Sequence, residues 1–296
     1  MEGSLPEFPG YQILARVHDD PNTAAFRGIR VRDGVPVLLK MLKPSHATPL
    51  GLSRFRNEYE VTRALKTDRV VKVYSLEPYE QTLFLVIEIS GGMRLDVLVR
   101  QWGKAGTELF PLARFFAIAG QIVEALAEVH AAGVIHKDLH PSAFLLIPST
   151  GKVKIGNFDL ATKLSRENPA LKHPLALEGA LAYMSPEQTG RMNRAIDYRT
   201  DFYSLGVTFY EMLTGRLPFE STDAMELVHA HLAKTPVTPC LLNPAIPRVL
   251  SDLVMKLMAK APEDRYQSAH GLKQDLDLCS SARALLLIQR FYPSQP

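Results

Sequence analysis

Two ionisable side chains in the first third of the chain lie in apolar surroundings, where they could form a buried ion pair. Lys40 ends the run VPVLLK, and the segment SRFRNEYEVTRAL (53–65) places Glu58 on one helical face with Phe55, Thr62 and Leu65. A carboxylate that is buried without a partner costs several kcal/mol. We therefore predict that Lys40 pairs with Glu58, although Lys and Glu side chains most often lie on protein surfaces.

The pentapeptide HKDLH (136–140) carries a carboxylate between two imidazoles at alternate positions. In an extended loop such positions share one side, so His136, Asp138 and His140 could together hold a metal ion. No further group of ligand residues in the sequence supports a metal site. We therefore rank the metal cluster second, behind the role that the neighbouring motifs give to Asp138.

The elements that must position these residues fall into two groups. Residues 11 to 89 are strand-rich, with short apolar runs at 35–42 and 82–89 and one helix that begins at a Ser53 cap. After the glycines at 91 and 92 the pattern becomes helical. Apolar residues recur at 115, 119, 122, 126 and 129, and further helices are predicted over 201–215 and 249–260. We expect an α+β fold with a boundary near residue 91.

Composition excludes several classes of function. The 296 residues are 46% hydrophobic and 22% charged, with a net charge of +3 and no run of like charges, so nucleic acid is not an expected partner. Cys240 and Cys279 show no metal-binding spacing, which favours a reducing compartment and a cytoplasmic location. No apolar run approaches the roughly 20 residues that span a bilayer, so we expect no membrane association.

Three motifs carry a family resemblance. HKDLHPSAFLL (136–146), KIGNFDLAT (154–162) and GALAYMSPE (179–187) resemble the HRDLKPxN, DFG and APE motifs of eukaryotic-type serine/threonine protein kinases. The resemblance implies a bilobal protein-kinase fold with a small β-rich N-lobe and a larger helical C-lobe. It assigns residues 1–10 to a lead-in, 11–90 to the N-lobe, 91–279 to the C-lobe and 280–296 to a helical tail.

The same resemblance implies a set of catalytic and structural residues. Lys40 and Glu58 stand at the positions of the strand lysine and its helical partner, and Asp138 stands where a carboxylate orients and deprotonates the acceptor hydroxyl. The structural residues that it implies are a packing histidine, the ion pair that anchors the activation segment and the aspartate that braces the catalytic loop: His136, Glu187 with Arg265, and Asp201.

The resemblance also implies a nucleotide site with an obstructed base pocket. Leu38 takes the place of the small residue above the adenine, where its side chain would fill the space of the base. We therefore expect ATP to bind with low affinity. The nucleotide-binding positions that the resemblance implies are Leu38, Lys40, Ile87, Glu88, Ile89, Leu145 and Asn157.

Several chemical groups of the family are missing. Ala143 and Asn157 stand where kinases have the metal-holding Asn and Asp, and Mg²⁺ prefers anionic oxygen ligands. We therefore assign no metal ligand and regard Mg²⁺ binding as doubtful. His140 replaces a lysine, and Ala180 replaces a threonine. Asp159, where the family has Gly, is either a replacement metal ligand or a solvated loop carboxylate, and we favour the second interpretation.

The glycine-rich loop of the family is also missing. His18, Asp20 and Thr23 take the three glycine positions in VHDDPNTAAF (17–26), which reads as an ordinary turn. Pro21 has no backbone N–H to offer a phosphate. A carboxylate within about 4 Å of a phosphate would cost on the order of 4 kcal/mol at an effective dielectric near 20. Both effects predict weak nucleotide binding.

The stretch TGRMNRAIDYRTDFYSLG (189–206) is similar to the kinase domain at the front of large bacterial proteins that also carry an ATPase-like module and a sensor histidine kinase. This resemblance implies a signalling role with a protein partner or substrate. Our first hypothesis is a pseudokinase that acts by partner binding with weak or no phosphoryl transfer. The alternatives are an active but atypical ATP-dependent serine/threonine kinase and, by fold analogy alone, a different nucleotide-handling transferase.

Overall fold

The computed structural model describes residues 5–104, 110–163 and 179–281. The chain forms two compact units. The first unit comprises Met1–Gly92 and Gly156–Ala161, and the second comprises Met93–Ile155 and Thr162–Pro296. The predicted helical tail at 280–296 lies almost wholly outside the described residues.

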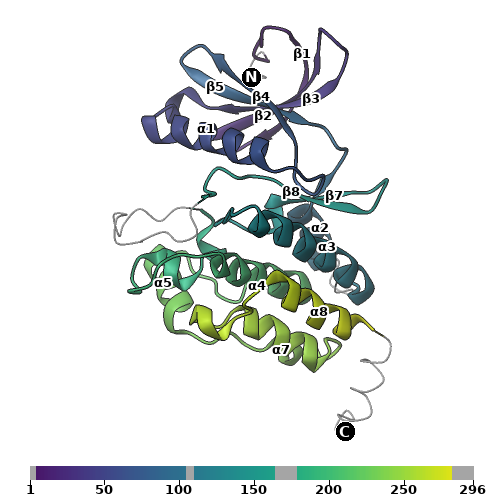
Figure 1. Cartoon of the computed structure of the whole chain (residues 1–296), viewed down its shortest axis with the longest axis vertical. Helices are drawn as coiled ribbons and strands as arrows, with labels where there is room; N and C mark the ends of the chain where they lie inside the picture. The colour runs from purple at the N-terminus through teal and green to yellow at the C-terminus, as the bar shows by residue number, and fades with distance from the viewer. Residues whose placement is uncertain (1–4, 105–109, 164–178, 282–296) are drawn as a thin grey trace. The chain divides into compact units, whose positions relative to one another are not determined.

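A five-stranded antiparallel sheet forms the body of the first unit, with the strand order β1-β2-β3-β5-β4 (Figure 1). Its strands are β1 (Tyr11–Asp19), β2 (Thr23–Arg30), β3 (Pro36–Leu42), β4 (Val73–Tyr79) and β5 (Thr82–Glu88). The apolar runs at 35–42 and 82–89 are therefore strands, as the sequence predicts. The two pair directly, with Leu38 opposite Ile87 and Lys40 opposite Leu85.

The two faces of β3 have different roles because successive side chains of a strand point to opposite sides. Val37 and Leu39 are fully buried in an apolar core that also contains Phe8, Phe26 and Phe84. Leu38 and Lys40 occupy the other face. The alternation of β3 therefore turns one face of the sheet toward its apolar core and places Lys40 on the opposite face.

Helix α1 (Pro49–Ala64) lies beside the sheet of the first unit (Figure 1). The Thr48 hydroxyl caps it by accepting the Gly51 N–H at 3.1 Å. The predicted Ser53 cap was wrong, because Pro49 can open a helix at its first position and the pair Thr48-Pro49 supplies an earlier cap. Phe55, Glu58 and Thr62 are buried, on the face that the sequence predicts.

The second unit is mainly helical (Figure 1). Its helices are α2 (Leu95–Lys104), α3 (Leu112–Ala131), α4 (Arg199–Thr214), α5 (Ala224–Ala233), α6 (Pro239–Leu242), α7 (Arg248–Leu257) and α8 (Ala269–Ser280). A small antiparallel sheet joins β6 (Met93–Arg94), β7 (Phe144–Ile147) and β8 (Lys152–Ile155). Short 3₁₀ turns lie at Pro44–His46 in the first unit and, in the second, at Pro141–Ala143, Leu181–Tyr183, Pro186–Thr189 and Pro262–Asp264.

Helices α3 and α4 form the core of the second unit. The predicted apolar repeat of α3 is fully buried at Phe115, Ala119, Ile122, Leu126 and Val129. Helix α4 is buried on almost all sides, including its polar residues Thr200, Asp201, Ser204 and Thr208. None of the described helices is long and apolar enough to cross a membrane.

Candidate active site

In the first unit, Lys40 reaches across from β3 to helix α1. Its ammonium lies 3.1 and 2.9 Å from the two carboxylate oxygens of Glu58 and donates a third hydrogen bond of 3.1 Å to Asn157 Oδ1. Glu58 is only 4% exposed and Lys40 17%. The buried ion pair that the sequence predicts is thus present, and Asn157 is added to it.

Burial and charge act on this cluster in opposite directions. Burial alone would lower the pKa of Lys40, but the carboxylates of Glu58 and Asp159 outweigh it and the pKa is raised. Burial raises the pKa of Glu58 against the opposing charge of Lys40, and Asp159 raises it further. The Lys40 ammonium therefore interacts with two carboxylates, those of Glu58 and Asp159, so negative groups outnumber positive ones in this cluster. The sequence analysis favoured a solvated loop carboxylate for Asp159, and this interpretation was wrong for its Oδ1, which is inaccessible to solvent.

The segment 156–161 is held onto helix α1 by a residue that the sequence analysis did not single out. The Asn57 side-chain amide donates to the backbone carbonyls of Asp159 at 3.3 Å and Ala161 at 2.8 Å. Asn157 has a φ of 66°, in the left-handed region that Asn tolerates better than most residues. The sequence signal that could have pointed to Asn57 is its position next to Glu58, which we expected to be buried.

The predicted base-binding residues of the first unit lie along β3 and β5 and just after them. Leu38 is half-buried and stands opposite Ile87 on the face that carries Lys40. Glu88 is engaged with Lys72, since its backbone N–H donates to the Lys72 carbonyl and its carboxylate accepts the Lys72 N–H, both at 2.9 Å. Ile89 follows the strand and is half-buried.

Two side-chain pairs and one backbone hydrogen bond hold the turn between β1 and β2. Lys43 Nζ lies 2.5 Å from Asp19 Oδ1, and the Lys43 N–H donates to the Asn22 carbonyl at 2.9 Å. His18 Nε2 lies 2.7 Å from Asp20 Oδ2. Asp20 is also among the charges that raise the pKa of Lys40. The turn thus brings carboxylates where the family has glycines, as the sequence predicts.

In the second unit, Asp138 is held by neighbours on both oxygens. Its Oδ1 accepts the Ala180 N–H at 2.8 Å, and its Oδ2 lies 3.5 Å from His140 Nε2. Burial would raise the pKa of Asp138, but the hydrogen bond and charge of His140 and the Ala180 N–H lower it overall. The other nitrogen of His140 lies 2.9 Å from Ser142 Oγ. Asp138 is therefore an ionised carboxylate in a fixed orientation.

The loop that carries Asp138 in the second unit is braced by Asp201 on α4. Its carboxylate accepts the backbone N–H groups of His136 at 2.9 Å and Lys137 at 2.8 Å. His130 Nε2 lies 2.8 Å from the same carboxylate, a contact that the sequence analysis missed. Lys137 has a φ of 66°, so the brace holds a strained backbone conformation.

A second buried ion pair anchors the segment after Tyr183. Arg265 donates to both oxygens of Glu187, at 2.6 and 2.8 Å, and the two side chains are 0% and 1% exposed. Thr200 donates to the same carboxylate at 2.8 Å. A buried bidentate ion pair strongly fixes the positions of both side chains. The pair of Glu187 and Arg265, which the sequence predicts, therefore helps to hold the second unit together.

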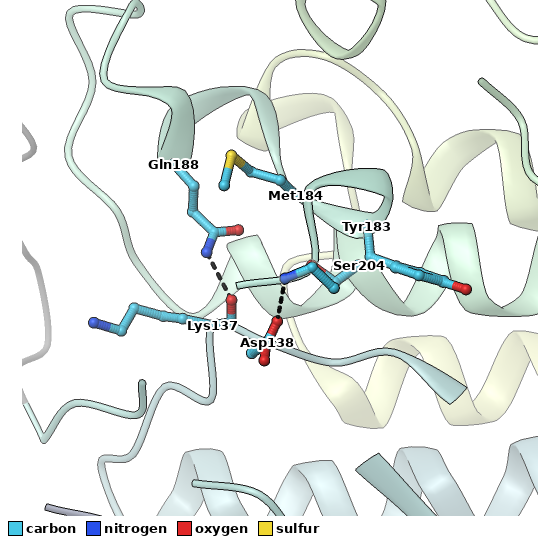
Figure 2. A pocket seen from close by; sticks show the side chains of 7 residues that line it. Lys137, Asp138, Tyr183, Met184, Gln188 and Ser204 are labelled. Atoms are coloured by element: carbon cyan, nitrogen blue, oxygen red, sulfur yellow. Dashed lines mark hydrogen bonds between the residues drawn. The ribbon is translucent and has the colours of Figure 1, made fainter. Parts of the chain in front are cut away.

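A depression beside Asp138 in the second unit has about 0 Å³ of space that a water molecule could enter (Figure 2). Figure 2 shows the Gln188 side chain donating to the Lys137 carbonyl, a bond of 2.7 Å. The Ala180 N–H, which donates to Asp138, also lies here. Ligand pockets are commonly about 300 to 1,000 Å³, so this depression is not a ligand cavity. Ala180 lines it and offers only its backbone to Asp138.

The positions that hold metal in the family do not fit a metal ion here. Ala143 is 2% exposed and has no ligand atom in its side chain. The oxygen of Asn157 accepts a hydrogen bond from Lys40, which a neighbouring cation would repel. Among the described residues, no three His, Cys, Asp or Glu side chains are grouped to hold a metal, so the alternative cluster of His136, Asp138 and His140 is excluded.

The fold and these two groups of residues define a protein-kinase-type domain, and comparison with known proteins agrees. Residues 22–276 match the family model described as "Protein kinase domain". The chain belongs to this family and has its bilobal α+β fold, with a β-rich N-lobe in the first unit and a helical C-lobe in the second.

Its relatives include serine/threonine kinases and a hybrid histidine kinase. The chain is 30% identical to serine/threonine-protein kinase Pkn1 of Myxococcus xanthus over 90% of its own length and 38% of the relative's. It is 30% identical to PknB of Mycobacterium tuberculosis over 92% of its length and 42% of the relative's. A 96-residue stretch, 32% of this chain, is 57% identical to 3% of hybrid signal transduction histidine kinase G of Dictyostelium discoideum. The chain thus spans less than half of each relative.

Proposed function

We propose that this chain is a pseudokinase-type signalling domain, which acts by binding a protein partner and transfers phosphate weakly or not at all. The observation that carries the proposal is the state of position 157. The family has a metal-holding carboxylate there, whereas Asn157 has a neutral amide whose oxygen accepts from Lys40 at 3.1 Å. Phosphoryl transfer depends on positioning and on metal ions that neutralise phosphate charge, so this loss acts directly on the chemistry.

Three further features support the proposal. Ala143 has no ligand atom, and Ala180 has no hydroxyl to offer Asp138. Asp19 and Asp20 bring negative charge to the turn between β1 and β2. Meanwhile the pairs that hold the framework, such as Glu187 with Arg265, are complete. An intact framework is sufficient for partner binding, whereas phosphoryl transfer would also need the missing groups.

The second candidate is an active but atypical serine/threonine kinase that uses ATP. The retained Lys40–Glu58 pair and the ionised Asp138 favour it. The names of the relatives favour it as well, since Pkn1 and PknB are called serine/threonine-protein kinases.

Two measurements on the same protein separate the candidates. The first is the thermal shift with millimolar ATP, without metal and with Mg²⁺ or Mn²⁺. The second is transfer of radiolabelled phosphate to the protein itself and to generic substrates, with Asp138→Ala as the control. We expect a small shift and no label above that control. Label that depends on metal and disappears in Asp138→Ala would overturn the pseudokinase proposal, and the absence of any shift would exclude the active kinase.

A further inference from the structure

A surface pocket of about 430 Å³ lies in the first unit, lined by the segment 5–9 together with Tyr11 and Ile13 of strand β1. We call it the β1 pocket. Its volume lies within the range of about 300 to 1,000 Å³ that is common for ligand pockets. None of the residues that the kinase motifs single out lines it, so the proposed function leaves the β1 pocket without a role.

A tight turn fixes the segment that forms one wall of the β1 pocket. Pro9 and Gly10 stand at the centre of this turn, and Gly10 has a φ of 81°, a pattern typical of a type II turn. The Tyr11 N–H closes the turn by donating to the Phe8 carbonyl at 3.1 Å. The Val31 N–H ties it to the end of β2 by donating to the Gly10 carbonyl at 2.9 Å.

Aromatic packing anchors the same segment on the sheet. Phe8 is only 3% exposed, and its ring centroid lies 4.6 to 5.6 Å from those of Tyr79, Phe84 and Phe26. The Tyr11 hydroxyl donates to Glu77 Oε1 on β4 at 2.7 Å. The β1 pocket is therefore formed in advance, which lowers the entropic cost of binding a ligand.

The lining of the β1 pocket is mostly apolar and partly open to solvent. Leu5 is 41% exposed and Ile13 is half-buried. Single exposed apolar side chains are normal on protein surfaces, but these two adjoin a pocket whose other walls are two prolines and two aromatic rings. Such a lining favours a ligand with an apolar group.

Glu7 gives the β1 pocket a negative charge. It is the one charged side chain among the described residues that line the pocket. Its side chain is exposed, and within the described part of the chain its carboxylate has no hydrogen bond or ion pair. The Glu77 carboxylate lies directly behind the Tyr11 hydroxyl. A basic group on a ligand would therefore be attracted, whereas an anionic ligand would be repelled.

We propose that the β1 pocket docks a peptide segment of a partner protein, with a large apolar side chain in the pocket and a neighbouring Lys or Arg paired with Glu7. This inference deepens the proposed function, because it gives the chemistry of the partner. It rests on that function only in treating the domain as one that binds another protein. It does not depend on whether phosphate is transferred.

The test uses the full chain and a phage-displayed library of short random peptides. Enriched peptides are synthesised with a fluorescent label, and their affinities are measured by fluorescence polarisation. We expect the enriched sequences to combine a large apolar residue with an adjacent Lys or Arg. Their affinity should fall at high salt, because salt screens exposed charge pairs.

Two substitutions in the lining probe the two parts of the recognition. Leu5→Ser should weaken binding of the selected peptide about fivefold or more, because it removes apolar contact area. Glu7→Lys should weaken it by about the same factor, because it places like charges together. A peptide with its basic residues replaced by glutamates should bind Glu7→Lys more tightly than it binds the parent.

Leu50→Ser and Glu60→Lys are the matched controls. Both replace exposed side chains of helix α1 in the same unit, outside the lining, and both should bind the selected peptide as the parent does. All four substitutions alter exposed side chains, so melting temperatures close to that of the parent are expected and confirm that the variants fold.

The inference would be overturned by a library that yields no enriched peptide, by enriched acidic sequences, or by equal affinity in the parent and both lining variants. A dimer in analytical ultracentrifugation that Leu5→Ser and Glu7→Lys dissociate would assign the β1 pocket to a second copy of the chain, and this too would overturn it. Failure of the proposed function is a separate result. Peptide binding together with radiolabel transfer supports this inference and overturns the pseudokinase, whereas neither binding nor transfer overturns this inference alone.

Discussion

At the scale of single residues, the charges that hold the framework find partners within the fold, and alanines stand at two positions where the family resemblance leads us to expect polar groups. Glu187 is satisfied by Arg265 and Thr200, and Asp201 by two backbone N–H groups. Ala143 and Ala180, at chemical positions, contribute no polar side-chain atom. Stability requires the first group whether or not phosphate is transferred, because unpaired buried charges are costly.

Lys260 gives a pH-dependent prediction at this scale. Burial, reinforced by the charge of Arg265, lowers its pKa from 10.5 to about 8. Between pH 8 and 10.5 the unfolded chain therefore binds the proton that the folded chain has released. The free energy of unfolding should gain a contribution that rises with pH across this window, and Lys260→Met should lack it.

Urea unfolding of both proteins at intervals from pH 7 to 10.5 measures this difference. Other groups titrate in the same range, so the comparison is between the two slopes and not between the absolute values. Lys260 donates to the backbone carbonyls of Ala230 and His231, and loss of these bonds shifts the whole curve of the variant. Parallel curves would contradict the prediction.

At the scale of elements, periodicity predicted where helices and strands form, but not all of their ends. The buried repeat of α3 and the strands β3 and β5 follow directly from their apolar spacing. The start of α1 did not, because Ser53 and Thr48 are both good caps and only the position of Pro49 decides between them. Helix ends depend on a few local bonds, whereas helix faces depend on many burial contacts.

The crossing of α4 and α7 gives a prediction at this scale. A Cβ on Gly206 would lie 2.7 Å from Leu257 Cβ and 2.9 Å from Met258 Cγ. Gly206→Ala should therefore destabilise the domain by about 1 to 3 kcal/mol, as overpacking of a core does. Chemical denaturation measures the change.

Gly120 on α3 is the matched control, since the nearest atom to its added Cβ is Lys273 Cε at 3.6 Å. Gly120→Ala should be neutral or stabilising by up to about 1 kcal/mol, because Ala favours helix. Equal effects of the two substitutions would show that helix propensity and not packing decides at both positions.

At the scale of the whole molecule, the residues to which the family resemblance assigns roles in phosphoryl transfer belong to two units. Lys40, Glu58 and Asn157 belong to the first unit, and Asp138 and Ala143 to the second. We therefore expect that repair of one unit alone would not restore phosphoryl transfer. The chain covers less than half of Pkn1 or PknB.

Restoring the missing metal ligands in both units tests this view. The double substitution Ala143→Asn with Asn157→Asp should improve metal binding but leave phosphoryl transfer far below the roughly 1 to 100 per second of ordinary kinases. Leu38 still stands at the position above the adenine in the family, and Asp20 still brings a carboxylate to the turn between β1 and β2. Transfer of radiolabel to a generic substrate is the measurement, and Asp138→Ala on the same background is its control. Ordinary kinase activity in the double variant would contradict the prediction.

The sequence by itself determined the family, the α+β architecture, the faces of β3, α1 and α3, and the pairing of Lys40 with Glu58. These features follow from apolar spacing and from the cost of burying a lone carboxylate, both of which are written in residue order. Only the tertiary structure decided which polar atoms find partners. Asn157 accepts the third hydrogen bond of Lys40, and Asn57 directs its amide to the carbonyls of Asp159 and Ala161. Among the described residues, Asp159 Oδ1 is left buried without a hydrogen-bond partner. Residue spacing cannot show such an imbalance, because it depends on where each hydrogen bond ends.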